Sequence, residues 1–171
     1  MIINIYDNLI KNPKEYVEEI LKGSFEDVEA VNEKGEKIIF KNLQGRGQDE
    51  FADLLNHAFP NYEIKFNFVR QSPYKQNEPN FIHKDDMMGD LTCLLYLNSS
   101  YPPKYGTTLY DEDKSKIFTY YAKYNSLLIF DSNIYHSRNI KKNFGKDHKS
   151  RLVQVAFLKK KKISDFLKML K

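Results

Sequence analysis

An imidazole and a carboxylate lie two residues apart in this sequence, at His83 and Asp85. In a strand, residues i and i+2 point to the same face. A strand over residues 80–85 would therefore let both side chains bind one ion. A third ligand must come from elsewhere in the chain, and the candidate is His136, which lies next to an apolar strand pattern.

Two histidines and one carboxylate are the ligand set of the facial triad that holds non-haem Fe(II) in oxygenases, with positions left open for cosubstrate and O₂. The His-x-Asp pattern is common by chance, and His83 and Asp85 also fit a salt-bridged surface pair or a cap-like pair. Asp86 is a competing ligand, but in a strand it faces the side opposite to Asp85. His136 also fits a hydrogen-bonded histidine at a strand end.

Arg151 begins the strand pattern of residues 151–158, 15 residues beyond His136. An inward-facing arginine in a dry pocket is costly unless it meets an anion. A carboxylate bound through two parallel hydrogen bonds is its best partner. Arg151 is therefore a candidate anion-binding residue, and the alternative is an ordinary surface charge at the start of a strand.

Together these pieces resemble the 2-oxoglutarate/Fe(II) dioxygenase superfamily, and within it the prolyl-4-hydroxylase-like group. The resemblance runs from about residue 66 to residue 157, which is over half of the chain. Six pieces occur in the family's order: Tyr74, the His83-x-Asp85 pair, the Leu-Leu-Tyr-Leu-Asn strand of residues 94–98, the Gly-Thr-Thr-Leu-Tyr strand of residues 106–110, His136-Ser137 and Arg151.

The resemblance implies a double-stranded β-helix with iron held between two sheets by His83, Asp85 and His136. It also implies that Arg151 binds the distal carboxylate of 2-oxoglutarate and that Tyr74 hydrogen-bonds the same group. Taken from the residues alone, Tyr74 also fits a loop or core aromatic. The implied cofactor is Fe(II) and the implied cosubstrate is 2-oxoglutarate, with ascorbate as a candidate addition.

The periodicity of the sequence predicts a single domain over residues 1–171 that is α+β and mainly β. In the helical support, residues 1–60, Asn12-Pro13 begins a helix that Gly23 ends. Residues 49–59 form a second helix, and short strands are predicted at 2–6 and 37–40.

In the predicted β-helix core, residues 61–158, short apolar or alternating stretches are separated by turn residues. The candidate strands are 62–68, 80–85, 91–97, 106–110, 116–121, 126–131, 134–137 and 151–158. Helices followed by about eight short strands favour a jelly roll or sandwich with helical support.

The net charge of +4 is concentrated at the C-terminus, because residues 159–171 carry six lysines against one acidic residue. That segment contributes +5, so residues 1–158 sum to −1. We predict a basic C-terminal helix that docks its apolar side on the sheet. The alternative is an anchor for polyanions, but the nearly neutral body argues against a nucleic-acid partner.

One cysteine, Cys93, excludes an intrachain disulfide and favours a reducing compartment. Cys93 lies in an apolar strand pattern and is predicted to be a buried thiol. The N-terminal residues lack the pattern of a signal peptide, and no segment reaches the ~18 apolar residues of a membrane span. These features predict a cytoplasmic protein without a membrane partner.

The implied reaction is the oxidative decarboxylation of 2-oxoglutarate to succinate and CO₂, coupled to hydroxylation of a substrate C–H bond. The expected substrate is a peptide or amino-acid side chain, or else a small metabolite. The rival enzyme is a metal-binding cupin with another reaction, in which Arg151 binds substrate directly. The rival of a different class is a non-catalytic binding module.

Overall fold

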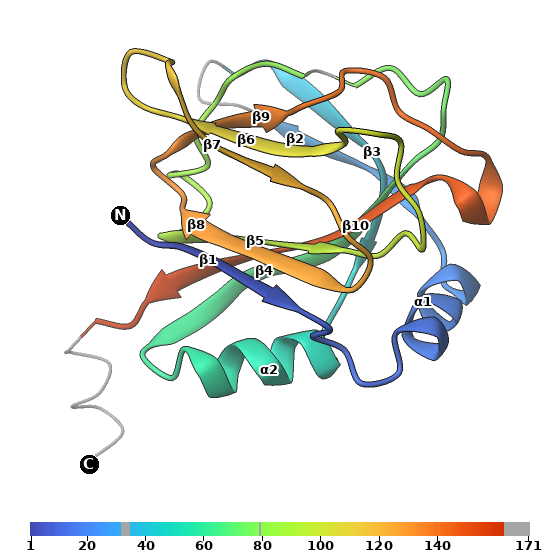
Figure 1. Cartoon of the computed structure of the whole chain (residues 1–171). Helices are drawn as coiled ribbons and strands as arrows, with labels where there is room; N and C mark the ends of the chain where they lie inside the picture. The colour runs from blue at the N-terminus through green and yellow to red at the C-terminus, as the bar shows by residue number, and fades with distance from the viewer. Residues whose placement is uncertain (32–34, 79, 163–171) are drawn as a thin grey trace.

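Two antiparallel sheets face each other in the computed structural model, which describes residues 1–31, 35–78 and 80–162 (Figure 1). The larger sheet has the order β1-β8-β5-β10-β4-β3-β2, formed by Ile3–Asp7, Ser126–Asp131, Leu91–Tyr96, Arg151–Lys160, Tyr62–Ser72, Lys37–Gly45 and Glu26–Val31. The smaller sheet has the order β7-β6-β9, formed by Lys116–Tyr121, Gly106–Tyr110 and Tyr135–Arg138. The mainly β, jelly-roll-like arrangement predicted from the sequence is confirmed.

The prediction of a regular strand over residues 80–85 is wrong. Only His83 pairs there, in an isolated antiparallel bridge with His136 of β9. This bridge adds a single paired residue to the edge of the smaller sheet beside β9. The backbone N–H of Asp85 instead donates to the carbonyl of Ser132, in the turn before β9, so the strand pairing does not continue past His83.

Two helices support the outer face of the larger sheet, as predicted (Figure 1). Helix α1, Pro13–Lys22, begins after Asn12 and ends at Gly23, although the Asn12 side chain makes no capping hydrogen bond. Helix α2, Glu50–Ala58, is capped by Asp49, which accepts a hydrogen bond from the backbone N–H of Ala52.

The helices pack on the larger sheet through one apolar core. Each strand sends alternate side chains to this face, and the fully buried members include Ile20 of α1, Phe51 of α2 and Cys93 of β5. The predicted burial of the Cys93 thiol is confirmed. Burying such side chains contributes about 1.5–3 kcal/mol each for the larger apolar ones.

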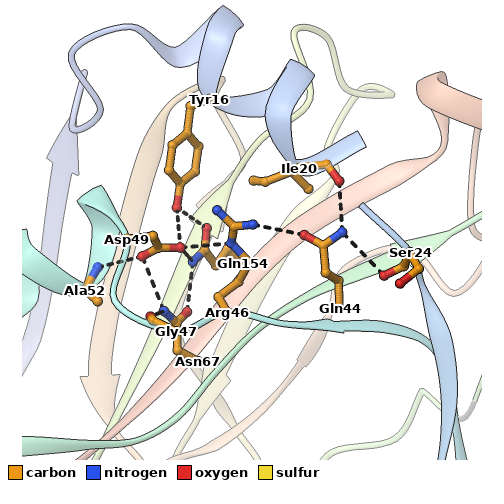
Figure 2. A network of polar contacts seen from close by, with 10 residues as sticks. All are labelled: Tyr16, Ile20, Ser24, Gln44, Arg46, Gly47, Asp49, Ala52, Asn67 and Gln154. Atoms are coloured by element: carbon orange, nitrogen blue, oxygen red, sulfur yellow. Dashed lines mark hydrogen bonds and ion pairs between the residues drawn. The ribbon is translucent and has the colours of Figure 1, made fainter. Parts of the chain in front are cut away.

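A polar network ties the same helices to the strands (Figure 2). The carboxylate of Asp49 accepts from Arg46 Nε at 3.0 Å and from Gln154 Nε2 of β10 at 2.9 Å. The hydroxyl of Tyr16 lies 2.9 Å from Asp49 Oδ2 and 2.7 Å from Gln154 Oε1. The network joins both helices to β10 and so fixes the strand that begins at Arg151.

A second core lies between the two sheets. Its buried members are Tyr96, Leu109, Tyr120, Leu128, Phe130, Ile134 and Val153. Strands β5, β8 and β10 contribute from the larger sheet, and β6 and β7 contribute from the smaller one. This core fills one part of the space between the sheets and leaves the ends of β4, β9 and β10 for polar groups.

Several element boundaries differ from the predictions. Strand β2 was not predicted, and β3 continues to Gly45 rather than ending at residue 40. A shift in the pairing of β4 with β10 near Ile64 and Phe66 breaks the regular alternation expected for residues 62–68. Ile64 consequently packs with the helix-side core, whereas Phe66 contacts Phe157.

The predicted basic helix over residues 159–171 is wrong for its first four residues. Lys159 and Lys160 extend β10 and do not belong to a helix, and residues 161 and 162 are not helical. The predicted docking helix at residues 163–170 lies outside the described residues. Within the described part of the chain, no helix combines the length and the apolar character needed to cross a membrane.

Candidate active site

The side chains of His83, Asp85 and His136 converge between the two sheets. One possible ligand atom from each lies within 4.8 Å of the others. Nε2 of His136 is 3.1 Å from Asp85 Oδ2, and Nε2 of His83 is 3.6 Å from Asp85 Oδ1. Two imidazole nitrogens and a carboxylate on one point are the donor set of the facial triad.

The backbone holds these three residues without a regular strand. His83 N donates to the His136 carbonyl at 3.1 Å, and His136 N donates to the His83 carbonyl at 2.8 Å. Asp85 N donates to the carbonyl of Ser132 at 2.8 Å. Residues 83–85 are therefore tied to β9 and to the turn before it, which preserves the common direction of His83 and Asp85.

The second nitrogen of each imidazole is engaged by a backbone carbonyl. Nδ1 of His83 lies 2.9 Å from the carbonyl of Phe81, and Nδ1 of His136 lies 3.1 Å from that of Ile134. A carbonyl only accepts, so each Nδ1 carries the proton and each Nε2 presents its lone pair. Burial, together with the nearby His136, lowers the pKa of His83. Both the donor set and the tautomers fit a divalent metal ion.

The carboxylate ligand has support of its own. Thr92 of β5 donates from Oγ1 to Asp85 Oδ2 at 3.4 Å, and its hydroxyl also lies 2.9 Å from Ser132 Oγ. The fully buried ring of Phe130 packs against the His136 ring at 4.8 Å between centroids. This side of the site is therefore both fixed and shielded from water.

Arg151 is buried at the start of β10, directly opposite Ser72 at the end of β4. Its Nη1 donates to Ser72 Oγ at 3.3 Å, and its Nε donates to the hydroxyl of Tyr105. Burial alone would lower the pKa of Arg151, but nearby Tyr105 and Glu78 raise it above the ordinary value. The predicted burial of this guanidinium is confirmed, and its binding of an anion stays a prediction.

The hydroxyl that contacts Arg151 belongs to Tyr105. Tyr105 stacks on Tyr101 at 5.6 Å and meets Phe144 edge-on at 5.1 Å. The side chain of Tyr74 is half exposed. The contact between Tyr74 and the cosubstrate therefore stays a prediction, and Tyr105 is a site residue that the sequence analysis missed.

A buried carboxylate, Glu78, also lies among the arginines and was not predicted. Its Oε1 accepts from Ser72 Oγ at 2.7 Å and from Gln76 Nε2 at 2.6 Å. Its Oε2 forms an ion pair with Arg138 Nη1 at 3.2 Å. Burial tends to raise the pKa of Glu78, but the Ser72 hydrogen bond and the positive charge of Arg151 outweigh it and hold the pKa below its usual value.

The loop between β9 and β10 closes this end of the site. Tyr74 N donates to the Gly145 carbonyl at 2.9 Å, and Arg151 N donates to the Phe144 carbonyl at 3.0 Å. Gly145 has φ of 74°, and a Cβ there would collide with the carbonyl of Lys149. Glycine is therefore needed for this turn, which orients the backbone at Arg151.

A shallow cavity of about 360 Å³ lies outside the arginines, lined by residues 74–78, 80 and 141–143. None of the three candidate metal ligands lines it. Glu78 and Asn143 do, and Asn143 accepts a hydrogen bond from Arg138 Nη1 at 2.6 Å. The cavity therefore borders the site through its arginine end and does not contain the metal-binding point.

Comparison with known proteins finds similar folds among solved structures but no match by sequence. No family model matches the sequence, and no curated protein matches it. Among solved structures, the α-ketoglutarate-dependent non-haem epimerase SnoN of nogalamycin biosynthesis is similar with a TM-score of 0.63 and 14% identity, over 92% of this chain and 78% of that one.

Two further solved structures resemble the fold of this chain. A prolyl-4-hydroxylase from Pseudomonas putida has a TM-score of 0.61 at 12% identity, over 94% of this chain and 93% of that one. A 2OG-Fe(II) oxygenase family oxidoreductase from Burkholderia pseudomallei has a TM-score of 0.58 at 8% identity, over 92% and 84%. At these identities the likeness shows the fold. The chain therefore has the double-stranded β-helix fold of the 2-oxoglutarate/Fe(II) oxygenases.

Proposed function

We propose that this protein is an Fe(II)- and 2-oxoglutarate-dependent dioxygenase that hydroxylates a C–H bond. The substrate would be a peptide or amino-acid side chain, or a small metabolite, and the co-products are succinate and CO₂. The observation that carries the proposal is the convergence of His83, Asp85 and His136 in the same inter-sheet space as the buried Arg151.

The comparisons support the choice of cofactor and cosubstrate. The SnoN epimerase has been solved with Fe³⁺ and α-ketoglutarate, and a viral collagen prolyl hydroxylase has been solved with 2OG. The epimerase has a TM-score of 0.61 and the hydroxylase one of 0.51 to this chain. A shared fold alone is weak evidence for a shared activity, so the proposal depends mainly on the side chains.

In this site, His83, Asp85 and His136 would hold the iron. When bound, the iron supplies the O₂ and redox chemistry that amino-acid side chains lack. Each histidine donates its Nδ1 proton to a carbonyl, which fixes its ring and leaves Nε2 free to bind metal. Thr92 keeps the Asp85 carboxylate oriented through its hydroxyl.

The opposite end of the site would bind the distal carboxylate of 2-oxoglutarate. Arg151 offers a planar, permanently charged fork, and Ser72 and Tyr105 place hydroxyls beside it. Burial of Arg151 removes competing water, so a charge-assisted contact is stronger there than at the surface. The apolar core between the sheets, including Phe130 and Val153, excludes water from the space behind these groups.

The test is succinate formation from 2-oxoglutarate by the Fe(II)-loaded protein under air, with and without ascorbate, against peptides, amino acids and nucleic acids. We expect substrate-stimulated succinate, and product heavier by one oxygen atom. The matched negative control is the His136→Ala variant.

Anaerobic addition of 2-oxoglutarate to the Fe(II) protein provides a second readout, because direct binding to the metal should produce a weak visible charge-transfer band. Metal binding without this band would favour a cupin with a different reaction. A band without succinate from any substrate class would favour a non-catalytic binding module.

A further inference from the structure

Arg70 is a third guanidinium in the site, and it has no assigned partner. It lies on β4 two residues before Ser72, so both side chains face the same side of the sheet. Arg70 is directly opposite Val153, as Ser72 is opposite Arg151. These pairings place Arg70 one step along the sheet from Arg151, on the face that encloses the site.

The side chain of Arg70 is incompletely satisfied. Its Nε is buried and has no hydrogen-bond partner. Within the part of the chain that the structure describes, no carboxylate lies within ion-pair distance of Arg70. Its guanidinium lies 5.7 Å from the centre of the Phe40 ring, and Phe40 is 37% exposed. Arg70 therefore belongs to the accessible side of the site.

The electrostatic surroundings of Arg70 link it to both halves of the site. Burial lowers the pKa of Arg70, Arg151 and Arg138 lower it further, and Glu78 and Asp85 oppose this. Arg70 is therefore close enough to interact electrostatically with Asp85, the candidate metal-binding carboxylate, and with Glu78 and the two arginines near it.

The charges of this cluster do not balance. Arg70, Arg138 and Arg151 bring three positive charges, and Glu78 brings one negative charge that is in ion-pair contact with Arg138. The proposed function gives Arg151 the distal carboxylate of 2-oxoglutarate. Arg70 then remains without a carboxylate partner, and a charge whose Nε is buried and unpaired is unfavourable unless a ligand neutralises it.

We propose that Arg70 binds a carboxylate of the molecule to be oxidised, so that the substrate class is an acid rather than a neutral side chain. This inference rests on the proposed function because that function assigns Arg151 to the cosubstrate. A planar guanidinium binds a carboxylate through two parallel hydrogen bonds, and the neighbouring Phe40 ring offers an apolar surface for the carbon chain attached to it.

The experiment uses the full chain loaded with Mn(II), without O₂ and saturated with 2-oxoglutarate. The probes are N-acetyl amino acids, each as the free carboxylate and as its matched carboxamide, with binding followed by saturation-transfer NMR. We expect the carboxylate to be preferred in at least one pair. Arg70→Gln should reduce that preference about tenfold or more, the scale of a lost charged hydrogen bond, and Arg70→Lys should restore it in part.

The matched control is Lys65→Gln, which removes the same charge from the same strand at an exposed ion pair with Glu63. It should leave the preference unchanged. Thermal melting of every variant checks that the fold is intact.

If no carboxylate binds better than its carboxamide, the inference is wrong. It is also wrong if Arg70→Gln weakens 2-oxoglutarate binding as strongly as Arg151→Gln does, since Arg70 would then belong to the cosubstrate site. An Arg70-dependent preference without any binding of 2-oxoglutarate would instead retain the anion site and refute the proposed dioxygenase.

Discussion

The same local arrangement occurs at both candidate metal-binding histidines. In each case Nδ1 faces the backbone carbonyl two residues earlier, Phe81 for His83 and Ile134 for His136. The carbonyls determine which nitrogen is protonated, so the rings are ready to bind metal before any metal arrives. Such preorganisation lowers the cost of assembling the site.

Removing any one of the three candidate ligands should reduce metal binding without unfolding the protein. We expect His83→Ala, Asp85→Ala and His136→Ala each to weaken Fe(II) or Mn(II) binding by at least about tenfold, because a facial site has three protein ligands. Isothermal calorimetry measures the affinity, and circular dichroism checks the fold. Wild-type affinity in all three variants would disprove the assignment.

Arg151→Ala should weaken 2-oxoglutarate binding while sparing metal binding. Truncating one partner of a buried, hydrogen-bonded charge pair costs about 2–5 kcal/mol, which is roughly 1.5 to 3.5 decades in affinity. Arg151→Lys should recover only part of this, because lysine lacks the planar fork. Calorimetry on the Mn(II) protein provides the comparison, and an unchanged affinity for 2-oxoglutarate in Arg151→Ala would place the anion site elsewhere.

At the scale of elements, Asp49 holds α2 and β10 together, and its effect should depend on pH. Burial tends to raise the pKa of Asp49, but hydrogen bonds from Ala52, Gln154 and Arg46 lower it overall. A lowered folded pKa stabilises the protein above the unfolded pKa of about 3.9. This contribution is lost as the pH falls through the folded value.

The corresponding prediction is that Asp49→Asn destabilises the protein by about 1–3 kcal/mol at pH 7. The difference from wild type should shrink as the pH is lowered below about 4. Urea unfolding at a series of pH values measures this difference. Asp113→Asn, at an exposed position, is the control, and a pH-independent difference for Asp49→Asn would contradict the argument.

Glu78 lies in the arginine cluster, where its carboxylate would compete with that of an incoming ligand. Glu78→Gln keeps the size of the side chain and a hydrogen-bond acceptor for Ser72, but it removes the negative charge. We expect about tenfold tighter 2-oxoglutarate binding, because one repelling unit charge within a few ångströms of a ligand carboxylate costs about 1 kcal/mol or more.

Calorimetry of the Mn(II) protein tests this expectation, with Glu18→Gln on the exposed side of α1 as the charge-matched control. Weaker binding in Glu78→Gln would mean that Glu78 serves to hold Arg138 and Ser72 in place. It would then not act as a competitor of the cosubstrate.

For the whole molecule, the site joins the two sheets. His83 and His136 belong to the smaller sheet and its edge, whereas Ser72 and Arg151 belong to the larger sheet. A ligand that contacts the metal and Arg151 together would therefore span the gap between the sheets. Ligand binding to the native state raises its stability by mass action.

We therefore predict that 2-oxoglutarate raises the melting temperature of the protein mainly when metal is present. At about 100 times the dissociation constant the gain is about 2.7 kcal/mol, or roughly 5–10 °C for a chain of this size. Differential scanning fluorimetry with Mn(II), with 2-oxoglutarate and with both measures it, and EDTA should reverse it. If 2-oxoglutarate raised the melting temperature equally with and without metal, it would not be a ligand that contacts both the metal and Arg151.

The sequence alone was enough to predict the candidate metal ligands, Arg151 and the two helices, because each is marked by residues close to it in the chain. His83 and Asp85 are two residues apart, His136 lies next to an apolar strand, and Arg151 begins one, so their types and order predicted a facial triad and an anion site. Helices α1 and α2 were likewise predictable, because Pro13, Gly23 and Asp49 act within one turn of the helix ends.

Only the tertiary structure decided the partners of Arg151 and the presence of Glu78, Arg138 and Arg70 in the site. The contacts of Arg151 with Tyr105 and Ser72 join residues 46 and 79 positions apart, and no local pattern encodes them. The sequence did contain one signal for Arg70: in β4 it follows Phe66 and Phe68 at two-residue spacing, so its side chain is predicted to face the same side of the sheet as theirs. The cost of burying a charge depends on the groups that surround it, and those groups meet only when the sheets close.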